Sequence, residues 1–444
     1  MAQEIVKRAQ EDGVRFISLQ FTDVTGSVKS ADIPVERLPS ALDEGVWFDG
    51  SSVEGFARIQ ESDMRLVLEP DSYAVLPWSH PERLRARVFC DIYNPDGTAF
   101  AGDPRGALKR VLKRVEGRGW TFNVGPEPEF FLLRTNGPGS IHPVPHDVGG
   151  YFDFSSSDEA QRVRAELMLA LSRMGLEVEM GHHEVARGQH EIDFRFTDAL
   201  RTADNVLTLK TAVKALAAHH GLVATFMPKP IFGINGSGMH THQSIFDRKG
   251  DNLFFDADDA FRLSGTAHGF IAGQLLHARG LAAIVAPTVN SYKRIVPGYE
   301  APVYVCWAQI NRSALIRIPR VSPGREKSTR VELRCPDPSC NPYLAFAVML
   351  AAGMDGVERK LTPPEPVNNL NIYEMTPEEL ATRKIDQLPG SLPEALDALE
   401  ADSVLRDALG ADIFEAFTRA KQAEWDLYRT HVTDWEVDTY LHVA

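Results

Sequence analysis

Hydrophobic and polar residues alternate with a period of two along much of the first hundred positions of this chain. The run from Val14 to Phe21, Val-Arg-Phe-Ile-Ser-Leu-Gln-Phe, is one example, and glycine and proline turns interrupt similar runs between Arg15 and Tyr93. Because successive side chains of a strand point to opposite faces, this pattern is typical of half-buried strands. It predicts a small, mostly β domain.

A connector rich in proline and glycine follows these strands. It contains Asn94-Pro95-Asp96-Gly97, and Asp103-Pro104 then supplies a helix N-cap with proline at the first helical position. We therefore expect one domain over residues 13–98 and a second over residues 103–444.

Beyond this boundary, apolar residues recur at helical spacing. Strands alternate with predicted helices over residues 157–174, 202–220 and 341–360, and glycines follow the first two of these helices. The tail contains two sequences typical of capping boxes, at 376–379 and 391–394, and then one apolar helix face from Ile413 to Tyr428. The pattern predicts a large α+β domain.

Composition narrows the class of protein. The 444 residues are 43% hydrophobic and 24% charged, with a formal net charge of -14. This charge argues against nucleic acid or an anionic membrane as the main partner. Met1 to Arg8 contain no apolar signal region and no later apolar run would span a bilayer, so a cytoplasmic protein is expected. The four cysteines, at positions 90, 306, 335 and 340, are expected to be reduced and buried.

The first candidate for chemistry is Gly125-Pro-Glu127-Pro-Glu129, which runs directly into four bulky apolar residues. In a strand, Glu127 and Glu129 point to the same face. Two like charges at the edge of a core are costly unless a cation lies between them. A proline-braced turn with solvated glutamates is the alternative interpretation.

Two later stretches repeat the arrangement of ligand residues on one strand face. Residues 182–196 are typical of two strands joined at Gly188, which could bring Glu184 towards Glu191. Residues 232–244 form a glycine-rich approach to a strand that presents His240, His242 and Ser244 on one face. A charged surface hairpin and an ordinary surface strand are the respective alternatives.

A third stretch gathers guanidinium groups around one carboxylate. Arg312, Arg317, Arg330 and Arg334 lie close in sequence to Glu332. Arginine binds phosphate oxygens without losing its charge, although a structural ion-pair ladder would use the same residues. Carboxylates with few histidines and no thiolates suit Mg²⁺ or Mn²⁺, and several metal ions beside arginines are typical of phosphoryl transfer.

Five motifs together resemble bacterial type I glutamine synthetases, in their shorter alpha subdivision. These motifs span residues 48–52, 125–131, 235–240, 290–302 and 341–344, and the resemblance runs from about Phe21 to Leu441. It implies an N-terminal β-grasp domain and a catalytic domain with an antiparallel-sheet active-site barrel and flanking helices. It also implies a dodecamer of two stacked hexamers, with active sites between subunits.

The resemblance further implies ligation of ammonia to glutamate with ATP, through a γ-glutamyl phosphate, and two or more Mg²⁺ or Mn²⁺ ions per site. One ion would be held by Glu129, Glu184 and Glu191, and the other by Glu127, His240 and Glu332. The remaining roles implied are catalytic for Asp49, Glu300, Arg312 and Arg334; substrate-binding for Asn235, Gly236, Arg294, Tyr151 and Ser52; nucleotide-binding for His242, Ser244, Arg317 and Arg330; and feedback regulation for Arg58.

Two other functions fit the same scaffold. One is a γ-glutamylamine ligase that uses a polyamine or another amine, and the other is a non-catalytic nitrogen-sensing or scaffold homologue. Asp49 in an intact Asp-Gly-Ser-Ser motif favours ammonia, because a carboxylate can accept the proton of ammonium. The full set of metal ligands and arginines favours an enzyme.

Overall fold

The computed structural model describes residues 2–51, 53, 55, 63–134, 143–154, 159–299, 301–311, 313–368 and 372–443. Ser52, Arg58, Glu300 and Arg312, which the resemblance implicates, lie outside the described residues. The N-terminal part is a six-stranded sheet of order β2-β1-β6-β4-β3, with β5 paired to β6. Its strands are β1 (Phe16–Thr22), β2 (Val28–Pro34), β3 (Val46–Asp49), β4 (Asp63–Leu68), β5 (Ala74–Val75) and β6 (Arg85–Tyr93).

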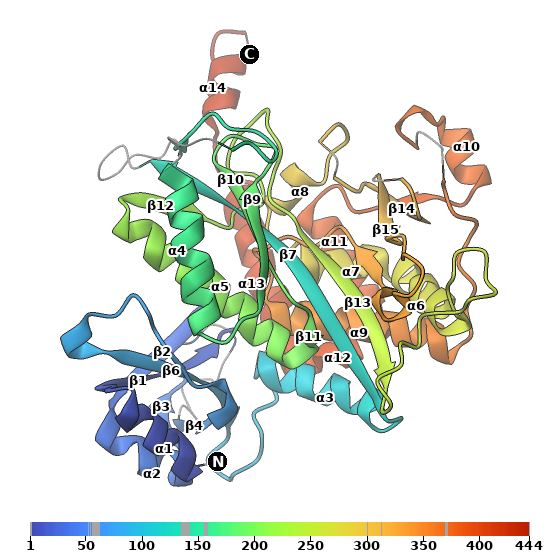
Figure 1. Cartoon of the computed structure of the whole chain (residues 1–444). Helices are drawn as coiled ribbons and strands as arrows, with labels where there is room; N and C mark the ends of the chain where they lie inside the picture. Colours follow the sequence, from blue (N-terminus) through green and yellow to red (C-terminus); the bar gives the residue numbers. More distant parts are fainter. Residues whose placement is uncertain are drawn as a thin grey trace.

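Two helices, α1 (Ala2–Glu11) and α2 (Leu38–Glu44), belong to this part (Figure 1). The alternating run predicted as a strand is β1, which pairs parallel with β6 and antiparallel with β2. Ile17 and Leu19 are fully buried in one core, but Ser18 and Gln20 on the opposite face are buried as well. The Ser18 hydroxyl, for example, donates to Asp32 at 2.6 Å. The prediction of a small, mostly β unit is confirmed.

The larger part is built on an 11-stranded curled sheet of order β17-β14-β15-β16-β13-β7-β10-β9, to which β8, β11 and β12 add by pairing with β7. Every pairing is antiparallel except that of β14 with β15. Its strands are β7 (Trp120–Arg134), β8 (Val144–Pro145), β9 (Val178–His183), β10 (Gln189–Phe194), β11 (Thr197–Asp198), β12 (Leu222–Thr225), β13 (Met239–Asp247), β14 (Tyr304–Ala308), β15 (Ala314–Arg317), β16 (Val331–Leu333) and β17 (Asp386–Gln387).

The helices of this part are α3 (Pro104–Glu116), α4 (Glu159–Arg173), α5 (Ala199–His219), α6 (Gly265–Leu276), α7 (Ala278–Val285), α8 (Ser291–Arg294), α9 (Pro342–Glu358), α10 (Pro377–Thr382), α11 (Leu392–Ala401), α12 (Ser403–Leu409), α13 (Ala411–Tyr428) and α14 (Asp434–Tyr440). The helices predicted over 157–174, 202–220 and 341–360 are α4, α5 and α9, so these predictions are confirmed. Helix α9 packs closely on α6. A Cβ added at Gly356 would lie 2.0 Å from the carbonyl oxygen of Gly269, so the glycine allows the two helices to approach this closely. All four cysteines are buried and free, as expected.

Capping explains where several helices begin. Asp103 accepts from the backbone N–H of Arg105 at 3.0 Å, which confirms it as the N-cap of α3. The capping box of Thr376 and Glu379 is also confirmed, at α10. The second predicted capping box is wrong, because the Ser391 hydroxyl donates to Glu394 at 3.0 Å and caps no backbone N–H.

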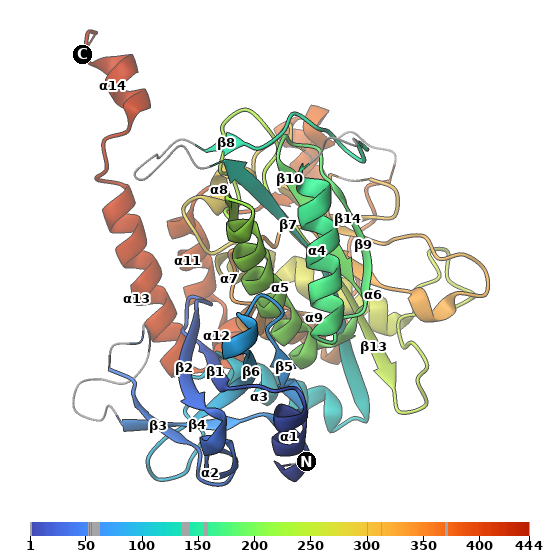
Figure 2. The same cartoon turned by 60° about the vertical axis from the view of Figure 1, so that its left-hand side comes forward.

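The two parts contact each other through the start of α9 and through α5. Asn341 caps α9, and its Nδ2 also donates to the carbonyl oxygen of Asp23 at 3.1 Å. Arg87 of β6 donates through Nη2 to the hydroxyl of Thr208 on α5, at 2.9 Å. Figure 2 shows the N-terminal sheet below α4 and α5, while α14 projects away from the rest of the chain. These contacts hold the N-terminal part against α5 and the start of α9.

Candidate active site

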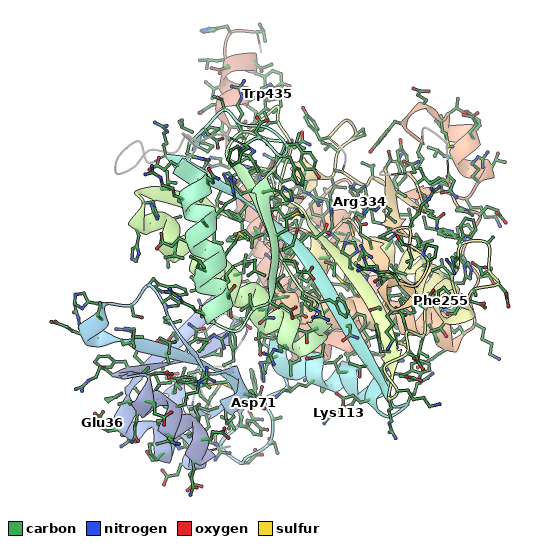
Figure 3. All side chains as sticks on the ribbon, in the orientation of Figure 1. Glu36, Asp71, Lys113, Phe255, Arg334 and Trp435 are labelled. Atoms are coloured by element: carbon green, nitrogen blue, oxygen red, sulfur yellow. The ribbon has the colours of Figure 1, made fainter. Side chains whose placement is uncertain are left out.

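A cavity of about 440 Å³ lies over the central strands of the large sheet. Most of the residues implicated by sequence line it, namely Glu127, Glu129, Tyr151, Glu184, Glu191, Asn235, Gly236, His240, Arg294, Arg317, Glu332 and Arg334. In Figure 3, Arg334 lies in the upper part of the sheet, away from Glu36 and Asp71 in the N-terminal part. Asp49, His242, Ser244 and Arg330 are not among the residues that line the cavity.

The register of the strands assembles this site. Strand β13 pairs with β7 so that His240 lies opposite Glu127, and with β16 so that His242 lies opposite Glu332. On the other side of β7, Glu129 lies opposite Glu191 of β10. Side chains on one face of neighbouring strands are close, so this register collects ligands from strands far apart in the chain.

The first cluster comprises Glu127, His240 and Glu332, which offer one ligand atom each within 4.8 Å of one another. Burial would raise the pKa of Glu127, but hydrogen bonds from His240 and His242 hold it well below its usual value. Burial, and then the charge of Arg334, lower the pKa of His240, which favours its neutral imidazole. An ionised carboxylate beside a neutral imidazole is a donor set that a divalent cation can use.

The second cluster comprises His182, Glu184 and Glu191, whose ligand atoms also lie within 4.8 Å of one another. Burial, and then the carboxylates of Asp193 and Glu127, raise the pKa of Glu191 to about 10. Burial, and then Glu191 and Glu184, raise the pKa of Glu129. Carboxylates that repel one another in this way are stabilised in their ionised form by a cation, so the residues fit a divalent ion.

Sequence reasoning missed His182 as a possible ligand. Its Nε2 lies 3.1 Å from Oε1 of Glu191, while Glu129 accepts from Nε2 of Gln189 at 2.7 Å and from the N–H of Gly238 at 3.0 Å. The position of His182, two residues before Glu184, was the available signal, because residues two apart share a strand face.

Three arginines surround these clusters. Arg317 donates through Nε to Glu332 at 2.5 Å, and Nε of Arg334 lies 3.2 Å from the other oxygen of the same carboxylate. Arg294 is buried and donates to the carbonyl oxygens of Cys335 and Arg334, at 3.0 and 3.2 Å. The cavity therefore combines a carboxylate face with a guanidinium face.

A chain of hydrogen bonds reaches Glu127 from outside the cavity. Nε of Arg330 lies 3.2 Å from Nδ1 of His242, and Nε2 of His242 lies 2.7 Å from Oε1 of Glu127. Because arginine can only donate, Nδ1 of His242 accepts and its proton is on Nε2. His242 therefore donates to Oε1 of Glu127, whose other oxygen lies 3.7 Å from His240.

Other implicated residues lie at the rim or away from the cavity. Tyr151 is about half exposed and packs edge-on against His182, with ring centroids 5.7 Å apart. Asp49, at the end of β3, accepts from the N–H of Ser51 at 2.8 Å. Ser244 is buried on β13.

Two carboxylate and imidazole clusters beside several arginines, on one curled antiparallel sheet, define a metal-dependent phosphoryl-transfer enzyme. Residues 13–95 match the family described as "Glutamine synthetase, beta-Grasp domain", and residues 101–440 match "Glutamine synthetase, catalytic domain". The chain belongs to the glutamine synthetase family. The resemblance of its motifs and the expected α+β fold are thereby confirmed.

Several relatives are similar over nearly their whole length. Proteins named glutamine synthetase from Thermotoga maritima and Thermus thermophilus are 51% and 52% identical, over 100% and 99% of this chain and 100% and 98% of theirs. The solved structure titled "GmaS/ADP complex-Conformation 1" has a TM-score of 0.88 at 36% identity, over 98% of this chain and 99% of its own. "CryoEM Plasmodium falciparum glutamine synthetase" also has a TM-score of 0.88, at 25% identity, over 99% and 98%. Within the described residues, no helix is long and apolar enough to cross a membrane.

Proposed function

We propose that this chain ligates ammonia to L-glutamate and converts ATP to ADP and phosphate, through a γ-glutamyl phosphate intermediate. The observation that carries the proposal is the cavity in which two metal-binding clusters face Arg294, Arg317 and Arg334. Identity of about half over the full length with relatives named glutamine synthetase favours this function over an amine ligase or a scaffold.

Two divalent ions, Mg²⁺ or Mn²⁺, would polarise the transferring phosphoryl group and neutralise its charge when bound. One set of ligands is Glu127, His240 and Glu332, and the other is Glu129, Glu184 and Glu191, which His182 joins in this structure. Both sets line one cavity, so the ions they would hold could bridge these carboxylates to the γ-phosphate of ATP beside the substrate glutamate.

Arginines stabilise negative charge on the transferring group. Arg317 and Arg334 each contact one side of Glu332, so both guanidinium groups are held next to the metal ligands. Donors fixed in place before the reaction stabilise developing charge without having to reorganise. We assign the same role to Arg312, and that of a lid over the acyl phosphate to Glu300.

Arg294 binds the α-carboxylate of glutamate in this proposal. It is buried, two backbone carbonyls hold its guanidinium, and Asn235 and Gly236 line the cavity beside it. A guanidinium fixed in this way can offer its remaining N–H groups to a carboxylate.

Replacing Arg294 by lysine is expected to raise the KM for glutamate about 10- to 100-fold, because one charged hydrogen bond is worth about 1.5–3 kcal/mol. The KM for ATP should change little. Steady-state kinetics measure both values, and Arg195→Lys, at an exposed position paired with Glu177, is the matched control. An unchanged KM for glutamate would remove Arg294 from this role.

We place the nucleotide next to the first cluster, with Ser244 and Arg330 on its side and His242 between nucleotide and metal. His242 contacts Glu127 directly, so it also orients a metal ligand. This gives His242 two testable roles, one towards the metal and one towards ATP.

Replacing His242 by alanine is expected to weaken Mn²⁺ binding about 10- to 100-fold, the usual effect of losing a residue that orients a ligand. Calorimetric titration with Mn²⁺ measures this loss, and ADP titration with EDTA present measures nucleotide binding separately. His268→Ala, at a histidine that pairs with Asp259, is the control. Weaker ADP binding with normal Mn²⁺ binding would restrict His242 to the nucleotide.

Asp49 accepts the proton of ammonium in this proposal, in a pocket that also uses Ser52 and Tyr151. Asp49 does not line the cavity of its own chain, so in this proposal a neighbouring subunit supplies it. This requirement supports a ring assembly with shared active sites, and we propose a dodecamer of two stacked hexamers. We further propose a cytoplasmic location, feedback by glutamine through Arg58, and domains over residues 13–98 and 103–444.

Product analysis tests the function as a whole. The full-length protein would be supplied with ATP, Mg²⁺, glutamate and either ammonium or a panel of amines, and the acylated product identified by mass spectrometry. Glutamine formed from ammonium supports the proposal. Product formed only from amines would identify an amine ligase, and no phosphate release with any acceptor would identify a binding protein.

A further inference from the structure

A second group of histidines lies on the opposite face of β9 and β10 from the active-site ligands. His183 and His190 are direct register partners of these two strands, next to the partners His182 and Glu191. Their rings are 4.7 Å apart, and that of His146 lies 5.2 Å from His190. All three histidines are buried.

Asp147 joins the three histidines. Its Oδ2 lies 2.8 Å from Nε2 of His146, and both of its carboxylate oxygens lie 3.1 Å from Nε2 of His183. Oδ1 also accepts from the N–H of Gly188 at 2.7 Å, which fixes the carboxylate. The ligand atoms of His146, Asp147 and His190 lie within 4.8 Å of one another. Residues from three separate segments thus converge on one carboxylate.

Backbone carbonyls determine the tautomers of two of these histidines. Nδ1 of His146 lies 3.1 Å from the carbonyl oxygen of Leu132, and Nδ1 of His183 lies 2.7 Å from that of Glu184. Since a carbonyl oxygen only accepts, each Nδ1 carries a proton, and Nε2, which faces Asp147, is the nitrogen through which each ring would bind an ion. A histidine that binds metal through one nitrogen commonly donates its other N–H to a backbone carbonyl in this way.

His190 has the other tautomer. Nη1 of Arg164 lies 2.8 Å from Nδ1 of His190, and arginine only donates, so the proton of His190 is on Nε2. This buried N–H has no hydrogen-bond partner among the residues that the structure describes. His190 is therefore suited to donate to a water or hydroxide ligand, and not to bind an ion itself.

We propose that His146, Asp147 and His183 bind a divalent transition-metal ion of the zinc class, with His190 donating Nε2–H to a water on the ion. Two imidazole nitrogens and one carboxylate oxygen, each with its orienting hydrogen bond, are typical ligands for Zn²⁺ and unlike the oxygen-rich sets that Mg²⁺ prefers. An adjoining cavity of about 680 Å³, lined in part by His146, Asp147 and His183, gives the ion a path to the site.

This site would cross-link the sheet behind the active site. The ion would join the chain after β8 to β9, at the residue that precedes Glu184. It is therefore a structural ion, distinct from the ions of phosphoryl transfer. The competing explanation is that two protonated histidines pair with Asp147 and no ion is required.

The test is calorimetric titration of the chelator-treated, full-length protein with Zn²⁺ in saturating Mg²⁺, which occupies the oxygen-rich sites. We expect the wild-type protein to bind one more equivalent of Zn²⁺ per chain than His146→Asn. His220→Asn, at a partly exposed histidine paired with Glu166, should bind as the wild type does. Titration of the wild-type protein with Co²⁺ should give visible absorption bands that His146→Asn lacks. The bands depend on the ligand field of the ion, which differs when an imidazole is bound.

Equal Zn²⁺ binding by the wild type and His146→Asn, with no Co²⁺ bands that depend on His146, would overturn the proposal in favour of the protonated pair. If His146→Asn does not fold, Asp147→Asn is measured instead, with the same expected loss. Neither readout uses catalytic activity, so failure here is distinguishable from failure of the proposed ligase function.

Discussion

Replacing Glu332 by alanine is expected to lower kcat/KM about 10²- to 10³-fold and to abolish Mn²⁺ binding at the first cluster. Glu332 belongs to the first cluster and is also the shared partner of Arg317 and Arg334. Without Glu332, the guanidinium groups of Arg317 and Arg334 lose the carboxylate that they share. An uncompensated buried charge costs about 3–5 kcal/mol, which corresponds to the expected fall in kcat/KM. Initial rates and calorimetric Mn²⁺ titration measure the two effects.

The control for this variant is Glu326→Ala, which removes a partly exposed glutamate from the chain just before β16. It should leave both kcat/KM and Mn²⁺ binding unchanged. A thermal unfolding profile of Glu332→Ala close to that of the wild type would exclude general unfolding. Normal Mn²⁺ binding by a folded Glu332→Ala protein would show that Glu332 is not a metal ligand.

Local sequence patterns predicted which side chains share one face of a strand. They did not predict which residues of the neighbouring strands lie beside those side chains. The alternation around Glu127 and Glu129 places both on one side of β7, and both line the same cavity. Which histidine meets which glutamate depends on the pairing of β7 with β13, whose residues are more than 100 positions away. Spacing along the chain contains no information on that register, because it is fixed by packing of the whole sheet.

Helices with strong local signals were also predictable. Asp103 before Pro104 and the capping box of Thr376 and Glu379 start helices where expected, because capping depends on residues close in sequence. At Ser391 the same pattern did not give a capping box, since Glu394 also accepts from the N–H of Gly390 at 3.0 Å. The group of His146, Asp147, His183 and His190 had no local signal, because it forms only when β8 and β10 pair with β7 and β9 pairs with β10.

Charge connects these observations. The carboxylates of the two clusters come from strands that are far apart in the sequence. In the folded chain these carboxylates line one cavity. Burial, and then the carboxylates of Asp193, Glu127 and Glu184, raise the pKa of Glu191 to about 10, because an ionised carboxylate is disfavoured in these surroundings. A fold that keeps such an arrangement without a cation would lose stability, so the excess of negative charge is itself an argument for bound metal.

Replacing Asp49 by alanine is expected to leave ATP binding unchanged and to lower ammonia-dependent turnover about 10²- to 10⁴-fold, the usual contribution of a general base. Calorimetric titration with ATP and assays of glutamine formation measure these two quantities. Because Asp49 lies at the end of β3 and not at the cavity of its own chain, the loss is expected to fall on the active site of a neighbouring subunit. Turnover equal to that of the wild type would remove Asp49 from the mechanism.

Co-expression of Asp49→Ala chains with Glu332→Ala chains tests this placement directly. Each variant alone should be nearly inactive, but in a mixed ring some sites combine the intact catalytic residues of one chain with the intact Asp49 of its neighbour. For random assembly through heterologous interfaces, about one quarter of the sites recover both groups, so about one quarter of wild-type activity is expected. If Asp49 acted within its own chain, no site in any mixture would be complete, and the mixed assembly would remain as inactive as its parents.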